Sequence, residues 1–241
     1  MPEIVPAARR VLVISSELPP GPGGIGTHAF AVATQLGAQG HEVRILGSQH
    51  YIGDAERAAF NRRSAVPIDP LPDRPDPLRT AVARARAIRH AIAMWQPDVI
   101  VASGGRILWL AAPSARRAGI PLVAVAHGTE LGGPRWQRAL TRRSLDRAAA
   151  VVAVSEFTAR LVRGLGVAAR VEVIPNGADG ERFAPERARR DRFRQMHGLG
   201  EGPVVLTVGN VTRRKGQHLV VEALPQLVAR FPDLIYALVG R

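Results

Sequence analysis

Residues 204–218 read VVLTVGNVTRRKGQH, and this stretch says most about the architecture of the chain. Its apolar run, which ends in Gly209, predicts a buried strand, and the segment after it predicts a helix. Three basic residues stand where that helix begins, namely Arg213, Arg214 and Lys215. Because cations oppose the positive end of a helix dipole, their gathering there predicts an anion bound among them. A diphosphate fits, since arginine offers a planar fork and lysine a mobile point charge; a solvated run of charges is the alternative.

Upstream of this stretch, short apolar runs alternate with amphipathic segments, which is the pattern of a parallel sheet covered by helices. A loop is expected between residues 46 and 78, because four prolines fall within its closing IDPLPDRPDP. The expected strands are residues 10–15, 42–46, 97–102, 121–126, 148–154 and 171–174, and the expected helices are 26–39, 78–95 and 155–163, the last capped by Ser155.

A second irregular segment, residues 175–202, separates this region from one further strand–helix–strand unit at 204–209, 215–230 and 234–240. We therefore expect two domains, residues 1–182 and 183–241. A single strand–helix–strand unit buries too little apolar surface to stand alone, so the second domain is expected to be incomplete.

The composition of the 241 residues is that of a globular protein, with 46% hydrophobic residues and no cysteine. No apolar run approaches the roughly 18 residues that span a bilayer, and the N-terminus lacks the apolar core of a secretory signal. A cytoplasmic location is therefore expected. The net charge of +13 is carried almost wholly by arginine, since Lys215 is the only lysine. Genomic base composition accounts for such a bias as readily as an anionic partner does.

The arginines are scattered with few aromatic residues between them, so no nucleic-acid partner is expected. Residues 135–147 (RWQRALTRRSLDR) are basic, with Trp136 and Leu140 one helical turn apart. This segment predicts either an ordinary surface helix or peripheral contact with anionic lipid at the inner face of the membrane.

The glycine-rich segment GPGGIG, residues 21–26, comes between the first strand and the first helix. Glycines let a phosphate approach the backbone closely, and the helix that follows offers free N–H groups. This segment has three interpretations: it contacts a phosphate or substrate, it forms a structural turn, or it belongs to a nicotinamide site. The last lacks the acidic residue that would close the second strand and hold a ribose, since Gly47, Ser48 and Gln49 stand there.

His127 lies in AHGTE, directly after the expected strand 121–126. Polar residues at the carboxyl end of a parallel strand face the crevice where open α/β sheets bind ligands. His127 is either a ligand for a sugar hydroxyl or phosphate, a proton relay, or a structural histidine. Further along, VIPNGAD at residues 173–179 is a turn placed as a hinge between the domains.

In their order and spacing, GGIG, AHGTE, VSEF, VIPNGAD and VGNVTRRKGQH resemble the motifs of the family-4 retaining glycosyltransferases, over residues 10–240. The resemblance implies a GT-B-type α/β fold, with a Rossmann-like N-terminal domain on a parallel sheet and the first βαβ unit of a second Rossmann-like domain. It also implies that a nucleotide-diphosphate sugar is the donor substrate. The sugar would pass to an acceptor glycan, lipid or small molecule with its anomeric configuration retained, without a metal or cofactor.

The resemblance assigns catalytic roles to His127, which would contact the transferred sugar, and to Lys215, which would neutralise the departing diphosphate. Fixed cations there would stabilise the charge that builds on the leaving phosphate. Asn210 stands where the family often has an arginine, so a neighbouring arginine would have to replace it. The expected substrate-binding residues are Gly23, Gly24, Gly26, Asn210, Arg213 and Arg214.

The family's later acidic motif would fall beyond Arg241, so the resemblance implies that residues 1–241 alone do not turn over. Two other classes stay open. A dinucleotide-binding oxidoreductase would bind NAD or NADP, and a non-catalytic module of glycosyltransferase shape would bind ligands without transferring a sugar.

Overall fold

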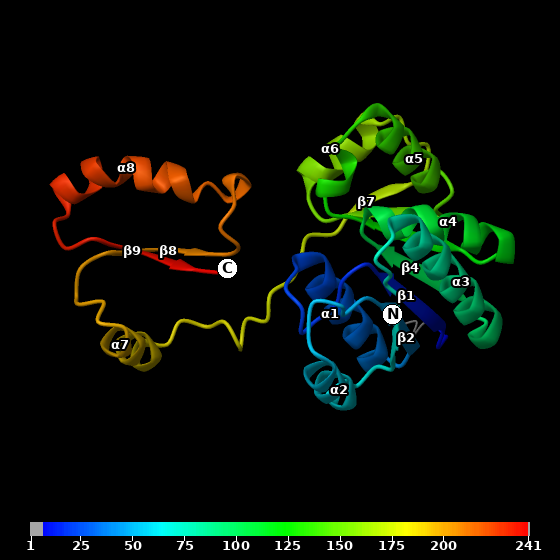
Figure 1. The fold of residues 1–241 in the computed structure, drawn as a ribbon, viewed down its shortest axis with the longest axis horizontal. Helices are drawn as coiled ribbons and strands as arrows, with labels where there is room; N and C mark the ends of the chain where they lie inside the picture. Colours follow the sequence, from blue (N-terminus) through cyan, green and yellow to red (C-terminus); the bar gives the residue numbers. More distant parts are fainter. Residues whose placement is uncertain (1–6, 241) are drawn as a thin grey trace, which may run out of the picture. The chain divides into compact units, whose positions relative to one another are not determined.

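The computed structural model describes residues 7–240 and divides the chain into two compact units, Met1–Gly177 and Ala178–Arg241. The boundary falls inside VIPNGAD. Each unit is treated below by itself, and Figure 1 shows the fold of each.

The N-terminal unit is built on a seven-stranded parallel sheet of order β3-β2-β1-β4-β5-β6-β7. Val13 at the centre of β1 pairs with Ile45 on one side and Val101 on the other. The direction of winding reverses between β1 and β4, because β2 and β3 extend the sheet one way and β5 to β7 the other. The strands are β1 (Arg10–Ser15), β2 (Glu42–Gly47), β3 (Ile68–Pro70), β4 (Val99–Ser103), β5 (Leu122–Ala126), β6 (Ala150–Ala153) and β7 (Val171–Val173). The expected parallel α/β fold is confirmed.

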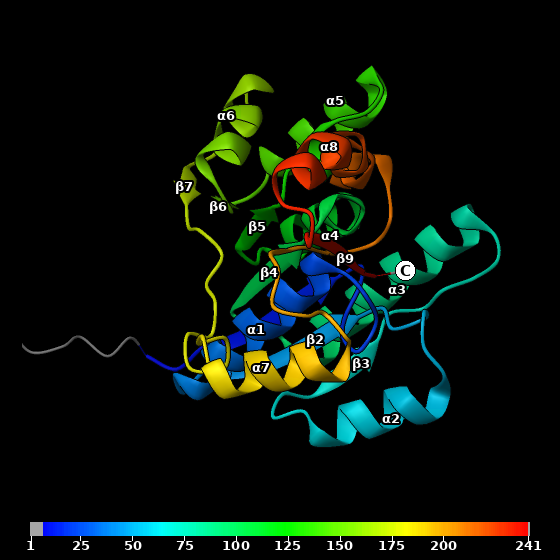
Figure 2. The ribbon, with the colours of Figure 1, turned by 90° about the vertical axis from the view of Figure 1, so that its left-hand side faces the viewer.

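Helices cover both faces of this sheet (Figures 1 and 2). They are α1 (Gly24–Ala38), α2 (Asp54–Arg63), α3 (Pro77–Trp95), α4 (Gly105–Ala118), α5 (Arg135–Leu145) and α6 (Glu156–Gly164), with a short 3-10 turn, η1 (Thr129–Leu131). The α1 helix packs on one face, where α2 joins it through the ring contact of Phe30 with Phe60 at 5.1 Å. The other helices pack on the opposite face. Among residues 7–240, no helix has both the length and the apolar character needed to cross a bilayer.

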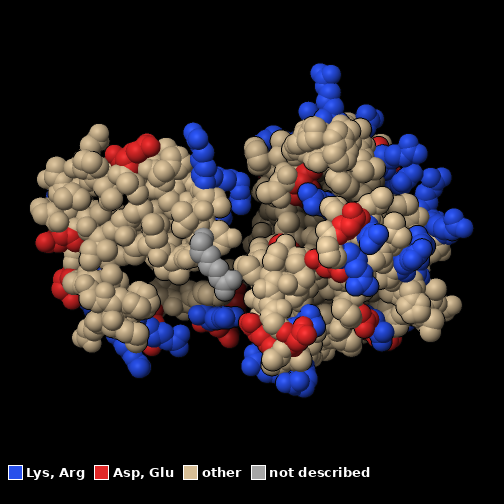
Figure 3. Space-filling model, viewed as in Figure 1, with Lys and Arg blue, Asp and Glu red and all other residues tan. Residues whose placement is uncertain are grey.

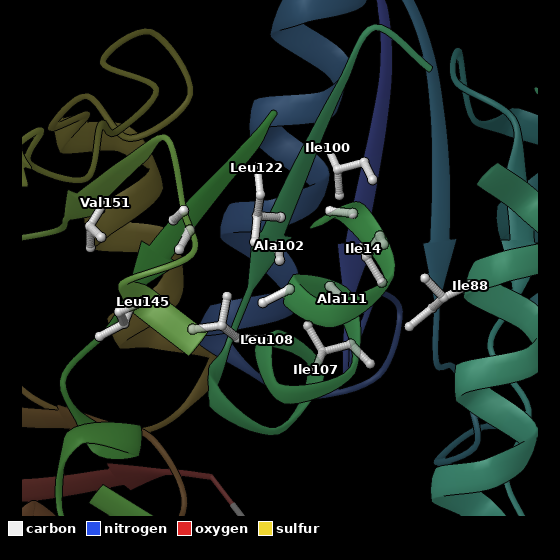
Figure 4. Packing of buried hydrophobic residues seen from close by; sticks show 14 of the residues in the cluster. Ile14, Ile88, Ile100, Ala102, Ile107, Leu108, Ala111, Leu122, Leu145 and Val151 are labelled. Carbon is white, nitrogen blue, oxygen red and sulfur yellow. The ribbon is translucent and has the colours of Figure 1, made fainter. Parts of the chain in front are cut away.

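Alternate residues of β1 belong to two different cores. Val11 and Val13 face α1, while Leu12 and Ile14 face α3 and α4. Figure 4 shows the second core, where Ile107 and other residues of α4 lie between the sheet and the neighbouring helices. Each Å² of apolar surface that α4 buries stabilises the fold by about 25 cal/mol, and this burial holds the helix in place. Its first turn is thereby fixed at the carboxyl edge of the sheet.

The prediction of a loop between residues 46 and 78 is wrong in part, because α2 and β3 lie within it. The α2 helix buries none of its side chains, so its sequence carries no apolar face to reveal it. The β3 strand has only three residues and pairs with β2 alone. Of the four prolines of the closing segment, Pro70 ends β3 and Pro77 begins α3, and only Pro72 and Pro75 lie in the expected loop.

The C-terminal unit contains the predicted strand–helix–strand unit. The strands β8 (Val204–Val208) and β9 (Ile235–Val239) pair in parallel, and α8 (Gln217–Arg230) connects them after a 3-10 turn, η2 (Arg213–Lys215). A further helix, α7 (Arg187–Met196), lies in the segment expected to be irregular, which corrects that expectation. It buries no side chain, so it too lacks the apolar periodicity that predicts a helix.

Candidate functional site

The candidate site in the N-terminal unit lies at the carboxyl edge of the sheet, where the strand order reverses between β1 and β4. Ligands of open α/β sheets bind in the crevice outside such a reversal. Three loops meet there: residues 16–23 after β1, Gly104 after β4, and His127 with Gly128 after β5. Glycine suits the last two turns because φ is +96° at Gly104 and +99° at Gly128.

His127 is held from two sides. Its Nε2 lies 3.0 Å from Oγ of Ser103, which ends the neighbouring strand β4. Its backbone N–H donates to Oε1 of Glu130 at 2.6 Å, so the carboxylate fixes the backbone at the start of the turn. One hydrogen bond therefore orients the imidazole and the other fixes the backbone that carries it, as expected of a group that must meet a ligand in one geometry.

A second histidine, His28 of α1, lies against His127. The ring centroids are 5.0 Å apart and the planes meet at 84°, an edge-to-face contact. Nδ1 of His28 is buried and has no hydrogen-bond partner among residues 7–240. Burial lowers the pKa of His28. Burial also lowers the pKa of His127, with Glu130 raising it and His28 lowering it further. Both rings are therefore neutral at pH 7, and each neutral imidazole can both donate and accept a hydrogen bond.

The glycine loop packs closely at one position and is open at another. Gly26 is buried, and a Cβ added there would lie 2.6 Å from the carbonyl oxygen of Glu17. The carboxylate of Glu17 accepts the backbone N–H of Gly26 at 3.2 Å. Gly23 and Gly24 are exposed, and a Cβ added at Gly24 would meet nothing within 4 Å. The structural-turn interpretation thus applies to Gly26, and contact of these glycines with substrate stays a prediction.

Two helices begin at this edge, and the residue that precedes each is a glycine, which has no side chain to cap it. Gly23 precedes α1 and Gly104 precedes α4, and neither helix has an acidic residue in its first turn. The first N–H groups of a helix lack internal partners, and its N-terminus carries a partial positive charge. The start of α4 is therefore suited to an anionic group such as a phosphate, whereas at the start of α1 the carboxylate of Glu17 already accepts the N–H of Gly26.

A hollow of the same unit opens beside this cluster. The segment between residues 49 and 77, whose sequence contains no recognisable functional motif, forms part of the wall of this hollow. Nδ1 of His50 lies 3.7 Å from a carboxylate oxygen of Asp73, and Nη2 of Arg84 lies 3.4 Å from the other. Its polar and aromatic lining residues are Ser16, Glu17, His50, Tyr51, Asp73, Arg74, Thr80, Arg84, Arg106, Trp109, Thr129, Glu130 and Gln137. A molecule rich in hydroxyl groups would find both hydrogen-bond partners and ring faces here.

The predicted residues of the C-terminal unit gather around the loop after β8. Gly209 has φ of +146°, and a Cβ added there would lie 3.9 Å from Nζ of Lys215. Asn210 accepts at its carbonyl a hydrogen bond from Nε2 of Gln217, at 3.0 Å. Gln217 is the one buried residue among the described residues of this unit.

The three predicted cations, Arg213, Arg214 and Lys215, form η2 and precede α8 instead of occupying its first turn. All three are exposed, and among residues 7–240 none has a carboxylate within 4.0 Å. Their charges are free to meet an anionic ligand.

Four site residues of the N-terminal unit were not predicted: Glu17, His28, Ser103 and Glu130. Glu130 lies within AHGTE, and Ser103 ends an apolar run, so each had a local sequence signal. His28 had none, because only the folded chain brings this residue of α1 to His127 in the loop after β5. Among residues 7–240, no group of three or more His, Cys, Asp or Glu is arranged to hold a metal ion.

Solved structures of similar fold define the class to which this architecture belongs. Anabaena HepE in complex with UDP-glucose superposes with a TM-score of 0.75 at 20% identity, over 95% of this chain and 60% of that one. Sucrose-phosphate synthase from Thermosynechococcus elongatus gives 0.73 at 18% identity, over 96% and 62%. The fold is that of a GT-B glycosyltransferase.

Sequence comparison gives the family. The family model described as Glycosyltransferase Family 4 matches residues 22–182. The chain is 31% identical to the GDP-mannose-dependent alpha-(1-6)-phosphatidylinositol monomannoside mannosyltransferase of Mycolicibacterium smegmatis, over 95% of this chain and 60% of that protein. It is 30% identical to a glycogen synthase of Mycobacterium tuberculosis, over 96% and 61%. The chain belongs to glycosyltransferase family 4 and spans about 60% of the length of these relatives.

Proposed function

We propose that the protein transfers a sugar from a nucleotide-diphosphate donor to a hydroxyl group of an acceptor, with retention of anomeric configuration. The observation that carries this proposal is His127, held by Ser103 and Glu130 at the carboxyl edge of the family-4 domain. The cations of η2, which have no carboxylate within 4.0 Å among residues 7–240, are the second support, because a departing diphosphate needs positive charge.

In the reaction, the bond between the anomeric carbon and the diphosphate oxygen breaks, and a bond to the acceptor oxygen forms on the same face of the sugar. The acceptor hydroxyl gives its proton to the departing diphosphate. Negative charge grows on the diphosphate, where Lys215 with Arg213 or Arg214 stabilises it. His127 is neutral at pH 7 and hydrogen-bonds a hydroxyl of the sugar, with Ser103 fixing its ring. No step in this scheme requires a metal or a cofactor.

The acceptor binds in the polar hollow beside His127 in this proposal. That hollow combines hydrogen-bonding groups with Tyr51 and Trp109, so it suits a glycan, the polar head of a lipid or a polyhydroxylated small molecule. The donor is a nucleotide sugar, in keeping with the GDP-mannose and UDP-glucose named for similar proteins.

The test is ligand-dependent thermal unfolding of the complete protein across a panel of nucleotide sugars, because a ligand that binds the native state raises Tm. The donor so found is then supplied with candidate acceptors, and the product is examined by NMR. A product of retained configuration is expected from the wild type, with a loss of at least 100-fold in rate for His127→Ala.

Three results would count against the proposal. A shift in Tm with NAD or NADP instead of nucleotide sugars would favour an oxidoreductase. Binding of nucleotide sugar without transfer to any acceptor would favour a non-catalytic module. An inverted product would contradict retention.

We further propose that the protein works in the cytoplasm and touches the inner face of the membrane through α5. The chain has no cysteine, which suits a reducing compartment. The α5 helix carries exposed arginines together with the exposed Trp136. Cell fractionation that finds the protein wholly in the soluble fraction at low salt would contradict the membrane contact.

A further inference from the structure

His50, which lines the polar hollow, stands at the same edge of the sheet as His127 but at some distance from it. It follows the carboxyl end of β2 by three residues, and His127 directly follows β5. Two strands, β1 and β4, lie between β2 and β5. At about 4.8 Å per strand spacing, the ends of β2 and β5 are roughly 14 Å apart. The hollow reaches both ends, because it is lined by His50 and by Thr129 and Glu130, which follow His127.

The imidazole of His50 is held by three side chains, although it lies in the segment between β2 and α2. Its Nδ1 shares a hydrogen bond with Oγ of Ser48, a buried residue directly after β2. The same nitrogen lies 3.7 Å from Oδ2 of Asp73. The ring also packs on Tyr51, with centroids 3.8 Å apart and planes that meet at 42°. These contacts leave the ring one orientation toward the hollow.

Asp73 is itself held by Arg84 of α3. Nη2 of Arg84 donates to Oδ1 of Asp73 at 3.4 Å, and its Nε donates to the carbonyl of Pro72 at 2.9 Å. The side chain of Arg84 is only 13% exposed, and α3 packs on the sheet. The carboxylate uses one oxygen for the arginine and the other for the histidine. The negative charge beside Nδ1 of His50 is therefore fixed in place.

The neighbours of Nδ1 decide which nitrogen of His50 carries the proton. A neutral imidazole has a proton on one nitrogen and a lone pair on the other. The charge of Asp73 favours the proton on Nδ1, with Oγ of Ser48 accepting it. Nε2 then keeps its lone pair, and among residues 7–240 it has no hydrogen-bond partner. It is suited to accept a hydrogen bond from an O–H group that enters the hollow.

The hollow has no excess of charge that would select an ionic ligand. Its lining holds as many carboxylates as guanidinium groups: Glu17, Asp73, Glu130, Arg74, Arg84 and Arg106. Acidic side chains likewise lie among basic ones on the face of the N-terminal unit that Figure 3 shows. The volume of about 700 Å³ is that of a small-molecule site. Hydrogen bonds are therefore the means by which this hollow can distinguish one ligand from another.

We propose that His50 selects the acceptor, with its Nε2 accepting a hydrogen bond from one hydroxyl group of a neutral, polyhydroxylated acceptor molecule. This inference rests on the proposed transferase function and names the residue that recognises the acceptor. Ser48, Asp73 and Arg84 are positioning residues, because they act through the ring of His50. Since the ends of β2 and β5 are roughly 14 Å apart, the hydroxyl that His50 binds is remote from the one that receives the sugar.

The first test compares His50→Phe with His90→Phe in the complete protein, with maltose and α-1,6-mannobiose as acceptors. Phenylalanine keeps a ring against Tyr51 and lacks the nitrogens. His90 is exposed on α3 and does not line the hollow, so its replacement is a matched control. Loss of one neutral hydrogen bond should raise the acceptor KM roughly 2- to 12-fold in His50→Phe. The kcat and the donor KM should change little, because the lost contact is remote from the reacting bond.

Acceptors that lack single hydroxyl groups test the contact directly. With the wild type, one monodeoxy form of the accepted disaccharide should have its KM raised by the same factor. In His50→Phe this monodeoxy form should cost nothing further, since the partner of the missing hydroxyl is already gone. A merely structural role of His50 would leave the penalty for each missing hydroxyl the same in both proteins.

The tautomer of His50 can be measured without donor or acceptor. Long-range proton–nitrogen NMR spectra of the imidazole in mildly alkaline buffer should show the proton on Nδ1 in the wild type. Asp73→Asn should shift the proton toward Nε2 and raise the acceptor KM as well. Circular dichroism establishes that each variant is folded.

A proton on Nε2 of His50 in the wild type would overturn the inference. So would an acceptor KM of His50→Phe equal to that of His90→Phe, or a hydroxyl penalty that is the same in the wild type and His50→Phe. If the wild type transfers no sugar to any acceptor, the proposed function fails and this inference fails with it. Transfer by the wild type with unchanged kinetics in His50→Phe refutes this inference alone, so the two failures are distinguishable.

Discussion

Replacement of Gly26 by alanine tests how the glycine loop is built. An alanine Cβ at this position would lie 2.6 Å from the carbonyl oxygen of Glu17 and 2.9 Å from Cα of Leu18. Both contacts are with backbone, which cannot swing aside as the end of a flexible side chain can. Gly24 offers a matched control two residues away, because a Cβ there meets nothing within 4 Å.

The two substitutions should have opposite signs. Overpacking at Gly26 is expected to cost about 1–3 kcal/mol, or roughly 2–12 °C in Tm for a unit of this size. At Gly24 the backbone can accept alanine, which lowers the entropy of the unfolded chain and should stabilise the unit by about 0.4–1 kcal/mol. The two variants should therefore differ by about 1.4–4 kcal/mol.

Urea unfolding followed by tryptophan fluorescence measures this difference. The three tryptophans, Trp95, Trp109 and Trp136, all lie in the N-terminal unit, so the signal reports that unit alone. A Gly26→Ala variant as stable as Gly24→Ala would show that the loop does not hold the helix as described.

Other predictions concern the two histidines and the C-terminal unit. His28→Gln should raise the pKa of His127, because a protonated His28 disfavours a second positive charge. Glu130→Gln should lower the pKa of His127, because it removes a nearby negative charge. NMR titration of the imidazole protons measures the pKa of His127 in each variant. The stability of the N-terminal unit should fall as the pH drops below 6.5, because both histidines have lowered pKa values in the folded unit and the unfolded chain then binds more protons. The urea midpoint of a His28→Gln/His127→Gln variant should fall less steeply with decreasing pH. An unchanged slope in this variant would contradict the prediction. Amides of β8 and β9 should exchange with deuterium faster than those of β1 and β4, because no hydrophobic side chain of the described C-terminal unit is buried; slower exchange there would contradict this.

The sequence was informative at several elements that pack in a core, although α4 (Gly105–Ala118), which buries seven residues, was not among the expected helices. The strand at residues 10–15 and the helix beginning near residue 78 lie close to their predicted bounds, because their apolar periodicity is that of elements packed in a core. Ser155 caps α6 as predicted, its hydroxyl accepting the N–H of Thr158 at 3.1 Å. The α2 and α7 helices escaped prediction because neither buries a side chain.

The site was predictable only in part. His127 could be singled out because it follows a strand, and the basic cluster at Lys215 because of its charge. The contact of His28 with His127 and the bond from Ser103 join residues far apart in the sequence, so only the folded sheet reveals them.

The most direct test of the proposed chemistry is the affinity of the complete protein for a nucleoside diphosphate, measured by calorimetry for the wild type, Lys215→Gln and the control Arg192→Gln. A charge-assisted contact to phosphate is worth about 1.5–3 kcal/mol, so Lys215→Gln should weaken binding by roughly 10- to 150-fold while the control leaves it unchanged. Undiminished affinity in Lys215→Gln would contradict the assignment of this lysine to the departing diphosphate.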